Sequence, residues 1–133
     1  MNVDGVVFGL AALDPILANG GSVSVTASTA GLEANSFDPY YAMTKHAVIG
    51  LVRSVAERFN SRNIAVNAFC PGGIDTALVP HQIRAVVPAE LLRPPEHIAA
   101  SLVAMARLRS TGSTWRPGGE PGTVYEYIVP GTA

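Results

Sequence analysis

A long helical pattern over residues 38–60 constrains the fold of this chain more than any other feature. Asp38 and Pro39 form a favourable helix start, because aspartate caps the first turn and proline suits the first helical position. Apolar residues then recur at spacings of three and four, the period of one helix face, at Ala47, Val48, Leu51, Val52, Val55, Ala56 and Phe59. This wide apolar stripe can pack against the chain's own sheet, against a second subunit, or against both.

Strands are predicted on both sides of this helix. Residues 22–27 are rich in Val, Ser and Thr, and residues 64–69 form a buried, mostly apolar pattern. The remaining segments are predicted as a helix over residues 1–19, a loop over 71–95, a helix over 96–109 and a last strand with a tail over 113–133. Strands that alternate with helices along a chain indicate an α/β fold. From the length we expect a single domain, residues 1–133.

Composition and charge argue against several classes of function. Charged residues make up only 14% of the chain and hydrophobic residues 48%, so we expect part of the surface to be covered by a partner subunit or by missing parts of the same fold. The net charge of −1 offers no attraction for nucleic acid or for an anionic membrane. The longest apolar run, Val6 to Leu13, is too short to span a bilayer. We expect a soluble cytoplasmic protein that binds neither nucleic acid nor a membrane.

The sequence does not predict a disulfide or a metal site. Cys70 is the only cysteine, which excludes an internal disulfide and a cluster of thiol ligands. His81 and His97 have no further ligand at metal-binding spacing. Cys70 has no histidine partner in the sequence, so a small buried residue is a better interpretation than a nucleophile.

The start of the long helix carries a pattern suited to proton transfer. Tyr41 and Lys45 are four residues apart and therefore share a helix face. A free phenol has a pKa of about 10, too high for proton transfer at neutral pH, and a neighbouring cation stabilises the phenolate. Ser28 follows the first predicted strand, where α/β folds place active residues, although a plain turn serine is the alternative. Tyr40 is a weaker candidate because its partner at i+4 is Thr44, which carries no charge.

These residues resemble a known family signature. Ser28 followed by Tyr41-Ala-Met-Thr-Lys45 resembles the Ser…Tyr-x-x-x-Lys pattern of the short-chain dehydrogenase/reductases. Three other stretches are similar to the family's Asn-bearing helix, the strand after its active-site helix and its nicotinamide loop: Asn2-Val-Asp-Gly5, Asn63-Ile-Ala-Val-Asn-Ala68 and Pro71-Gly72-Gly-Ile-Asp-Thr76. The resemblance implies a partial Rossmann-like, doubly wound fold of three α/β/α layers, with a parallel sheet reduced to about three strands.

The resemblance also implies a role for each of these residues. Tyr41 would act as the general acid/base, and Lys45 would stabilise its phenolate and bind the cofactor ribose. Ser28 would orient the substrate oxygen, and Asn2 would hold a water that links the lysine to solvent. The cofactor-binding residues implied by the family are Tyr41, Lys45, Pro71, Gly72, Ile74 and Thr76.

The activity implied by the family is hydride transfer between a nicotinamide cofactor and a small carbonyl or alcohol substrate. The cofactor is NAD or NADP, and the sequence does not indicate which. Residues 77–93 would form a flap over the substrate. In this family, copies associate through the helices that correspond to residues 2–18 and 38–60, so we expect a homo-oligomer.

Two departures from the family leave a second interpretation open. No Gly-x-x-x-Gly-x-Gly turn precedes Asn2, so the sequence lacks the pyrophosphate-binding turn and supplies only the last strands of the family's sheet. Arg116-Pro117 stands where the family has an acid before two glycines. The alternative is a non-catalytic remnant or dimerisation module without independent cofactor binding, in which Asn2 is a plain helix residue and Pro71-Gly72 an ordinary turn. Sugar epimerases and dehydratases share Tyr-x-x-x-Lys but fit the spacing less well.

Overall fold

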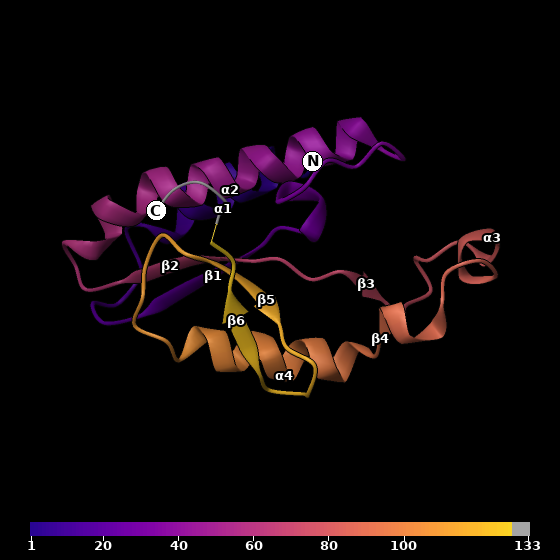
Figure 1. Cartoon of the computed structure of the whole chain (residues 1–133). Coiled ribbons are helices and arrows are strands. Elements are labelled where there is room, and N and C mark those ends of the chain that lie inside the picture. The colour runs from indigo at the N-terminus through magenta and orange to yellow at the C-terminus, as the bar shows by residue number, and fades with distance from the viewer. Residues whose placement is uncertain (129–133) are drawn as a thin grey trace.

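The computed structural model describes residues 1–128 of the 133-residue chain as a sheet between two layers of helices (Figure 1). The helices are α1 (Asp4–Leu13), α2 (Pro39–Asn60), α3 (His81–Arg84) and α4 (Pro95–Ala106), with 3-10 turns η1 (Thr29–Gly31) and η2 (Ala89–Leu91). The strands are β1 (Ser22–Thr26), β2 (Ala65–Phe69), β3 (Gly73–Ile74), β4 (Leu92–Arg93), β5 (Thr114–Pro117) and β6 (Val124–Glu126). α1 and α2 cover one face of the main sheet and α4 covers the other, which confirms the predicted α/β/α fold class.

The main sheet has the order β1-β2-β5-β6. β1, β2 and β5 are parallel, which confirms the prediction of about three parallel strands. β6 adds an antiparallel edge strand, with Trp115 opposite Glu126 and Pro117 opposite Val124. The predicted last strand and tail extend to residue 133, of which residues 129–133 lie outside the described residues.

The central strand β2 divides the core into two halves. All five of its residues are buried, because strands flank it on both sides and helices cover both of its faces. Successive side chains of a strand point to opposite faces. Val66 and Ala68 accordingly join the apolar cluster under α2, with Val48, Val52 and Phe59. Phe69 faces the other layer and packs with Ile98 and Met105 of α4.

Two predicted segments differ from the structure. The first helix is shorter than residues 1–19 and ends at Leu13, because Pro15 has no N–H and its ring clashes with the preceding turn. The predicted loop over residues 71–95 contains β3, β4, α3 and η2. Pro80 and Pro88 stand at the N-caps of α3 and η2, and such short elements leave no helical or strand periodicity to read.

Within residues 1–128, none of the helices has the length and hydropathy to cross a bilayer. In the same part of the chain, no cluster of His, Cys, Asp and Glu side chains has a geometry that could hold a metal ion.

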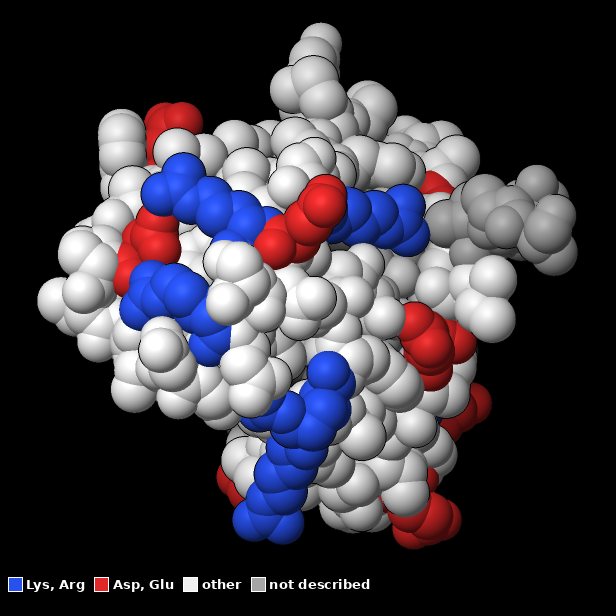
Figure 2. Space-filling model, turned by 90° about the vertical axis from the view of Figure 1, so that its left-hand side faces the viewer, with Lys and Arg blue, Asp and Glu red and all other residues white. Residues whose placement is uncertain are grey.

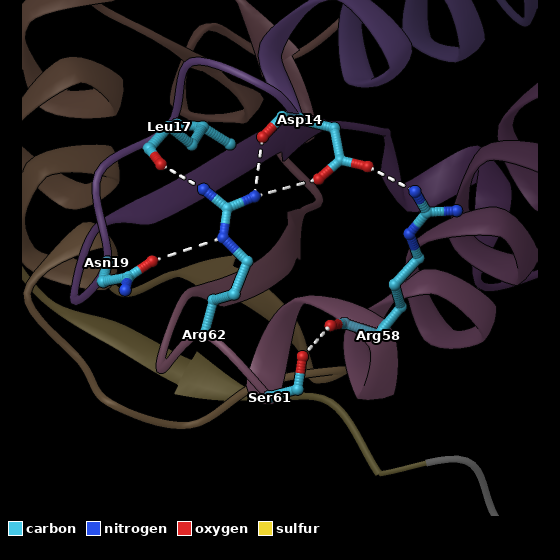
Figure 3. Close-up of polar contacts among 6 residues, drawn as sticks. All are labelled: Asp14, Leu17, Asn19, Arg58, Ser61 and Arg62. Atoms are coloured by element: carbon cyan, nitrogen blue, oxygen red, sulfur yellow. Dashed lines mark hydrogen bonds and ion pairs between the residues drawn. The ribbon is translucent and has the colours of Figure 1, made fainter.

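The parallel strands begin at the end of the molecule where α2 ends, at the left in Figure 1. The face at that end carries basic and acidic side chains next to one another (Figure 2). Arg58 in the last turn of α2 and Arg62 just beyond the helix take part in a network around Asp14 (Figure 3). The Asp14 carboxylate accepts hydrogen bonds from Arg58 at 2.6 Å and from Arg62 at 3.1 Å.

Arg62 ties the connection between α1 and β1 to the end of α2. Its guanidinium donates to the backbone oxygen of Asp14 at 2.6 Å and to the Asn19 side-chain oxygen at 3.2 Å. It also donates to the backbone oxygen of Leu17 (Figure 3). A planar fork with several donors suits this set of acceptors, whereas an ammonium acts as a single point charge.

We expect Arg62→Lys to lower the free energy of unfolding by about 1–3 kcal/mol, because lysine cannot reach all of these acceptors. The matched control is Arg58→Lys, whose side chain is 76% exposed and which we expect to change stability by less than about 1 kcal/mol. Urea unfolding of both variants measures the difference. Equal effects at the two positions would contradict this account.

Candidate active site

The site lies at the carboxyl ends of β1 and β2, opposite the face of Figure 2. Ser28 caps η1, and its hydroxyl oxygen accepts a hydrogen bond from the Ala30 amide at 3.1 Å. This hydrogen bond is the one expected of a plain turn serine, the alternative interpretation of Ser28. A serine hydroxyl has one donor and two acceptor positions, so this bond leaves its O–H proton available to a further acceptor.

The start of α2 forms as its sequence predicts. Asp38 caps the helix by accepting a hydrogen bond from the Tyr41 amide at 2.9 Å, and Pro39 stands in the first turn. The two neighbouring tyrosines then face different surroundings. Tyr40 is 79% exposed, whereas Tyr41 is partly buried and lines a large pocket.

Lys45 lies beside Tyr41, with Nζ 5.6 Å from the centroid of the phenol ring. The same ammonium donates a hydrogen bond to the backbone oxygen of Thr26, at the end of β1, at 3.2 Å. Partial burial lowers the pKa of Lys45 from its ordinary value, and the thiolate form of Cys70 opposes this shift. Lys45 is the only lysine of the sequence, and it connects the helix of Tyr41 to the strand that precedes Ser28.

Gly31 brings η1 into direct contact with α2. A Cβ atom at this position would lie 2.7 Å from the backbone oxygen of Lys45 and 2.8 Å from Cδ1 of Ile49. Only glycine therefore allows this approach. The contact places the turn capped by Ser28 directly against the helix that carries Tyr41 and Lys45.

Asn2 reaches α2 from the start of the chain. Its side-chain amide donates to the Thr44 hydroxyl at 3.3 Å, and that hydroxyl donates to the backbone oxygen of Tyr41 at 2.7 Å. The side chain of Asn2 therefore contacts Thr44, the residue that precedes Lys45 in α2.

The predicted cofactor residues of the loop after β2 do not all lie at one pocket. Ile74 and Thr76 line the large pocket together with Tyr41. Gly72 lines a separate pocket of about 280 Å³ beside Thr29 and Arg116. Pro71 is buried, and its backbone oxygen accepts a hydrogen bond from the Thr29 amide at 3.0 Å, which anchors the loop beneath η1.

The large pocket has a volume of about 850 Å³ and lies between α2, the β3–β4 pair and α3. Its walls are mainly apolar side chains of the segment predicted as a flap, none of which the sequence assigns a role of its own: Leu78, Val79, Ile83, Val87, Leu91 and Leu92. Phe37, just before α2, completes the wall. For the residues after β3, the only sequence signal is the density of apolar side chains between Thr76 and Pro94, in a stretch without regular periodicity.

Arg84 holds α3 against the loop after β3. Its guanidinium pairs with the Asp75 carboxylate and donates to the backbone oxygen of Thr76 at 2.9 Å. The backbone of Asp75 is fixed in turn, because its amide donates to the Arg93 oxygen at 2.9 Å. This clasp, formed by Arg84, Asp75 and the backbone of Thr76, is not predicted from the sequence. Two opposite charges nine residues apart in a loop follow no helical or strand periodicity that would indicate a contact.

Cys70 is buried at the end of β2. Burial raises the pKa of its thiol to about 11, although a backbone hydrogen bond from Ser28 and nearby positive charges oppose the shift. The reactive form of cysteine is the thiolate, which is scarce at neutral pH under these conditions. The side chain therefore belongs to the core rather than to the chemistry of the site.

Comparisons with known proteins agree on one group. A family model described as enoyl-(acyl carrier protein) reductase matches residues 1–114. A short-chain dehydrogenase/reductase of Penicillium rubens, prx7, is 42% identical over 65 residues, which cover 49% of this chain and 23% of that protein.

Two solved structures show the same fold. A short-chain dehydrogenase/reductase from Serratia marcescens matches with a TM-score of 0.75 and 24% identity over 92% of this chain and 54% of its own. The angucycline C-6 ketoreductase LanV, solved with bound NADP, matches with a TM-score of 0.78 and 21% identity over 91% of this chain and 51% of its own. The chain thus spans about half the length of these proteins.

Proposed function

Because this chain belongs to the short-chain dehydrogenase/reductase family, we propose that it forms part of an oxidoreductase that moves hydride between a nicotinamide cofactor and a carbonyl or alcohol carbon. One observation carries this proposal. Tyr41 lines a pocket of about 850 Å³, and the ammonium of Lys45 lies 5.6 Å from its ring centroid. A phenol beside a cation at the wall of a large apolar pocket is suited to exchange a proton with a bound carbonyl or alcohol oxygen.

In this proposal Tyr41 is the acid/base. In the reductive direction its O–H donates the proton to the substrate oxygen, and in the oxidative direction the phenolate accepts the proton of the alcohol. The charge of Lys45 stabilises the phenolate through space. Ser28 uses its remaining O–H donor to orient the substrate oxygen, while its lone pair stays bonded to the Ala30 amide. Asn2 supports proton exchange with solvent next to Thr44.

When bound, NADH or NADPH would supply the hydride in the reductive direction, and the oxidised cofactor would accept it in the oxidative direction. The residues present fit the nicotinamide and ribose end of such a cofactor. The Lys45 ammonium lies beside Tyr41 and has donors to offer to ribose hydroxyls. The Thr76 hydroxyl lines the pocket, and Gly73 brings a backbone without side chain to its wall. Pro71 and Gly72 would support this end from beneath η1. The pyrophosphate end has no corresponding Gly-x-x-x-Gly-x-Gly turn in this sequence.

A second candidate is a non-catalytic association module. It is favoured by the position of β1 at the edge of the sheet and by an open groove of about 310 Å³ between α1 and α2. Apolar residues line this groove, among them Val7, Leu10, Leu51 and Val55. In this candidate, copies of the chain associate through the two helices and no cofactor binds. The same association is compatible with the oxidoreductase.

Titration of the purified chain with NADH and NADPH separates the two candidates. Cofactor fluorescence reports binding, and circular dichroism of the same sample shows that the chain is folded. Binding in the micromolar range that is weakened by Lys45→Met supports the oxidoreductase. A folded sample that binds neither cofactor overturns independent cofactor binding and leaves the association module. Reduced nicotinamide mononucleotide in a parallel titration tests the nicotinamide end alone, because it lacks the adenosine half.

A further inference from the structure

The walls of the large pocket carry almost no polar groups. Among the described residues that line it, the hydroxyls of Tyr41 and Thr76 are the only polar side-chain groups, and none of the side chains is charged. The other lining residues are Phe37, Gly73, Ile74, Leu78, Val79, Pro80, Ile83, Val87, Leu91 and Leu92. A charged ligand in this pocket would lose its hydration without gaining an ionic partner among the side chains that line it.

Two charged residues that adjoin lining residues, Arg84 and Asp75, pair with each other. Arg84 pairs with Asp75 and with the backbone of Thr76, so the guanidinium of α3 is occupied by the loop that it clasps. Neither Arg84 nor Asp75 lines the pocket. The clasp therefore shapes the pocket without offering a counter-charge to a ligand.

Several lining side chains expose apolar surface that a ligand could cover. Phe37 is 83% exposed, Leu78 is 89% exposed and Leu91 is 60% exposed. They come from the two sides of the pocket, the approach to α2 and the segment around α3. Large exposed apolar groups that meet around one cavity mark a binding surface rather than scattered surface residues.

The volume sets the size of the ligand. Sites for drug-sized ligands have volumes of about 300–1,000 Å³, and this pocket, at about 850 Å³, lies in the upper part of that range. The nicotinamide end proposed to lie against Gly73 and Thr76 would fill part of this volume. A two-carbon or three-carbon carbonyl compound would still leave the walls formed by Phe37, Leu78 and Ile83 uncovered.

We infer that the substrate is a bulky, neutral and mainly apolar ketone or secondary alcohol, such as a fused-ring compound, rather than a carboxylate, a phosphate or a sugar. This inference rests on the proposed function only in giving the oxygen of that ligand to Tyr41. The ligand class itself follows from the walls of the pocket. Leu78 is assigned as a residue that determines specificity, because it contributes apolar surface at the exposed rim.

Binding of prodan, a neutral naphthyl ketone whose emission shifts to the blue in apolar surroundings, tests the inference. We expect prodan to bind the unmodified chain with a blue shift, and a naphthalene carboxylate of the same ring size to compete about tenfold more weakly or not at all. Equal affinity for the ketone and the carboxylate would overturn the inference, as would the absence of prodan binding by a folded chain.

Two variants test the position of the site. Leu78→Asp places a carboxylate at the rim, and we expect it to weaken prodan binding about tenfold or more. The matched control is Val86→Asp, in the same segment: Val86 is 75% exposed but does not line the pocket, so we expect unchanged affinity. Both side chains are exposed, so neither change removes a core residue. Equal losses in the two variants would show that prodan binds elsewhere and would overturn the assignment of Leu78.

This experiment separates the inference from the proposed function. Prodan binding without NADH or NADPH binding would support the ligand class and remove the oxidoreductase. Cofactor binding combined with equal affinity for ketone and carboxylate would keep the oxidoreductase and remove the ligand class.

Discussion

We expect Tyr41→Phe to lower the rate of NADPH-dependent or NADH-dependent ketone reduction by about 100- to 10,000-fold, the range that a positioned acid or base supplies. Phenylalanine keeps the ring that lines the pocket and removes only the hydroxyl that donates the proton. The loss should therefore appear in kcat, while prodan affinity and the free energy of unfolding change little. Cofactor fluorescence follows turnover with prodan or another aromatic ketone as substrate.

The neighbouring tyrosine provides the control. Tyr40→Phe makes the same chemical change one position earlier in the same helix, at a residue that is 79% exposed and does not line the pocket. We expect its rate to equal that of the unmodified chain. Full activity in Tyr41→Phe, or equal losses in both variants, would contradict the role proposed for Tyr41.

We expect Gly31→Ala to destabilise the chain by about 1–3 kcal/mol and to reduce ketone turnover as well. The added Cβ would lie 2.7 Å from the Lys45 backbone oxygen, and a backbone atom of a long helix cannot move aside as the end of a flexible side chain can. The turn must then retreat from α2. Because Ser28 caps that turn, its hydroxyl moves away from the helix of Tyr41.

A second glycine on the same helix provides the matched comparison. Gly50 lies in the interior of α2, and a Cβ there meets no atom within 4 Å. Gly50→Ala should therefore stabilise the chain by up to about 1 kcal/mol, because alanine is the better helix former. Urea unfolding measures both variants. If Gly31→Ala were neutral or stabilising, the close contact between η1 and α2 would not hold.

The substitutions at Tyr41 and Gly31 affect the same site in different ways. Tyr41→Phe removes a chemical group and leaves the scaffold, whereas Gly31→Ala keeps every functional group and alters the distance between two elements. A loss of activity in both variants, with a loss of stability in only the second, would show that the site depends on the contact between η1 and α2 as well as on its side chains.

Local sequence patterns determined the main helix and the central strand of this protein. The cap at Asp38, the apolar stripe of α2 and the buried strand over residues 65–69 each depend on neighbours along the chain, so their periodicity predicts them. The spacing of Tyr41 and Lys45 similarly follows from one helix turn and predicts that the two side chains lie together. The resemblance of these stretches to one family was confirmed by the match over residues 1–114.

Only the tertiary structure decided what surrounds this pair. The hydrogen bond from Lys45 to Thr26 joins residues 19 positions apart, and the contact of Gly31 with Lys45 joins a turn to a helix. The pocket combines Phe37 and Tyr41 with side chains from residues 73–92, which have no periodicity of their own. Such contacts depend on how separate elements pack in space, and the pattern within a single segment does not predict the distance between two segments. The proximity of Tyr41 and Lys45 could therefore be predicted from the sequence, whereas the neutral, apolar character of the pocket beside them required the fold.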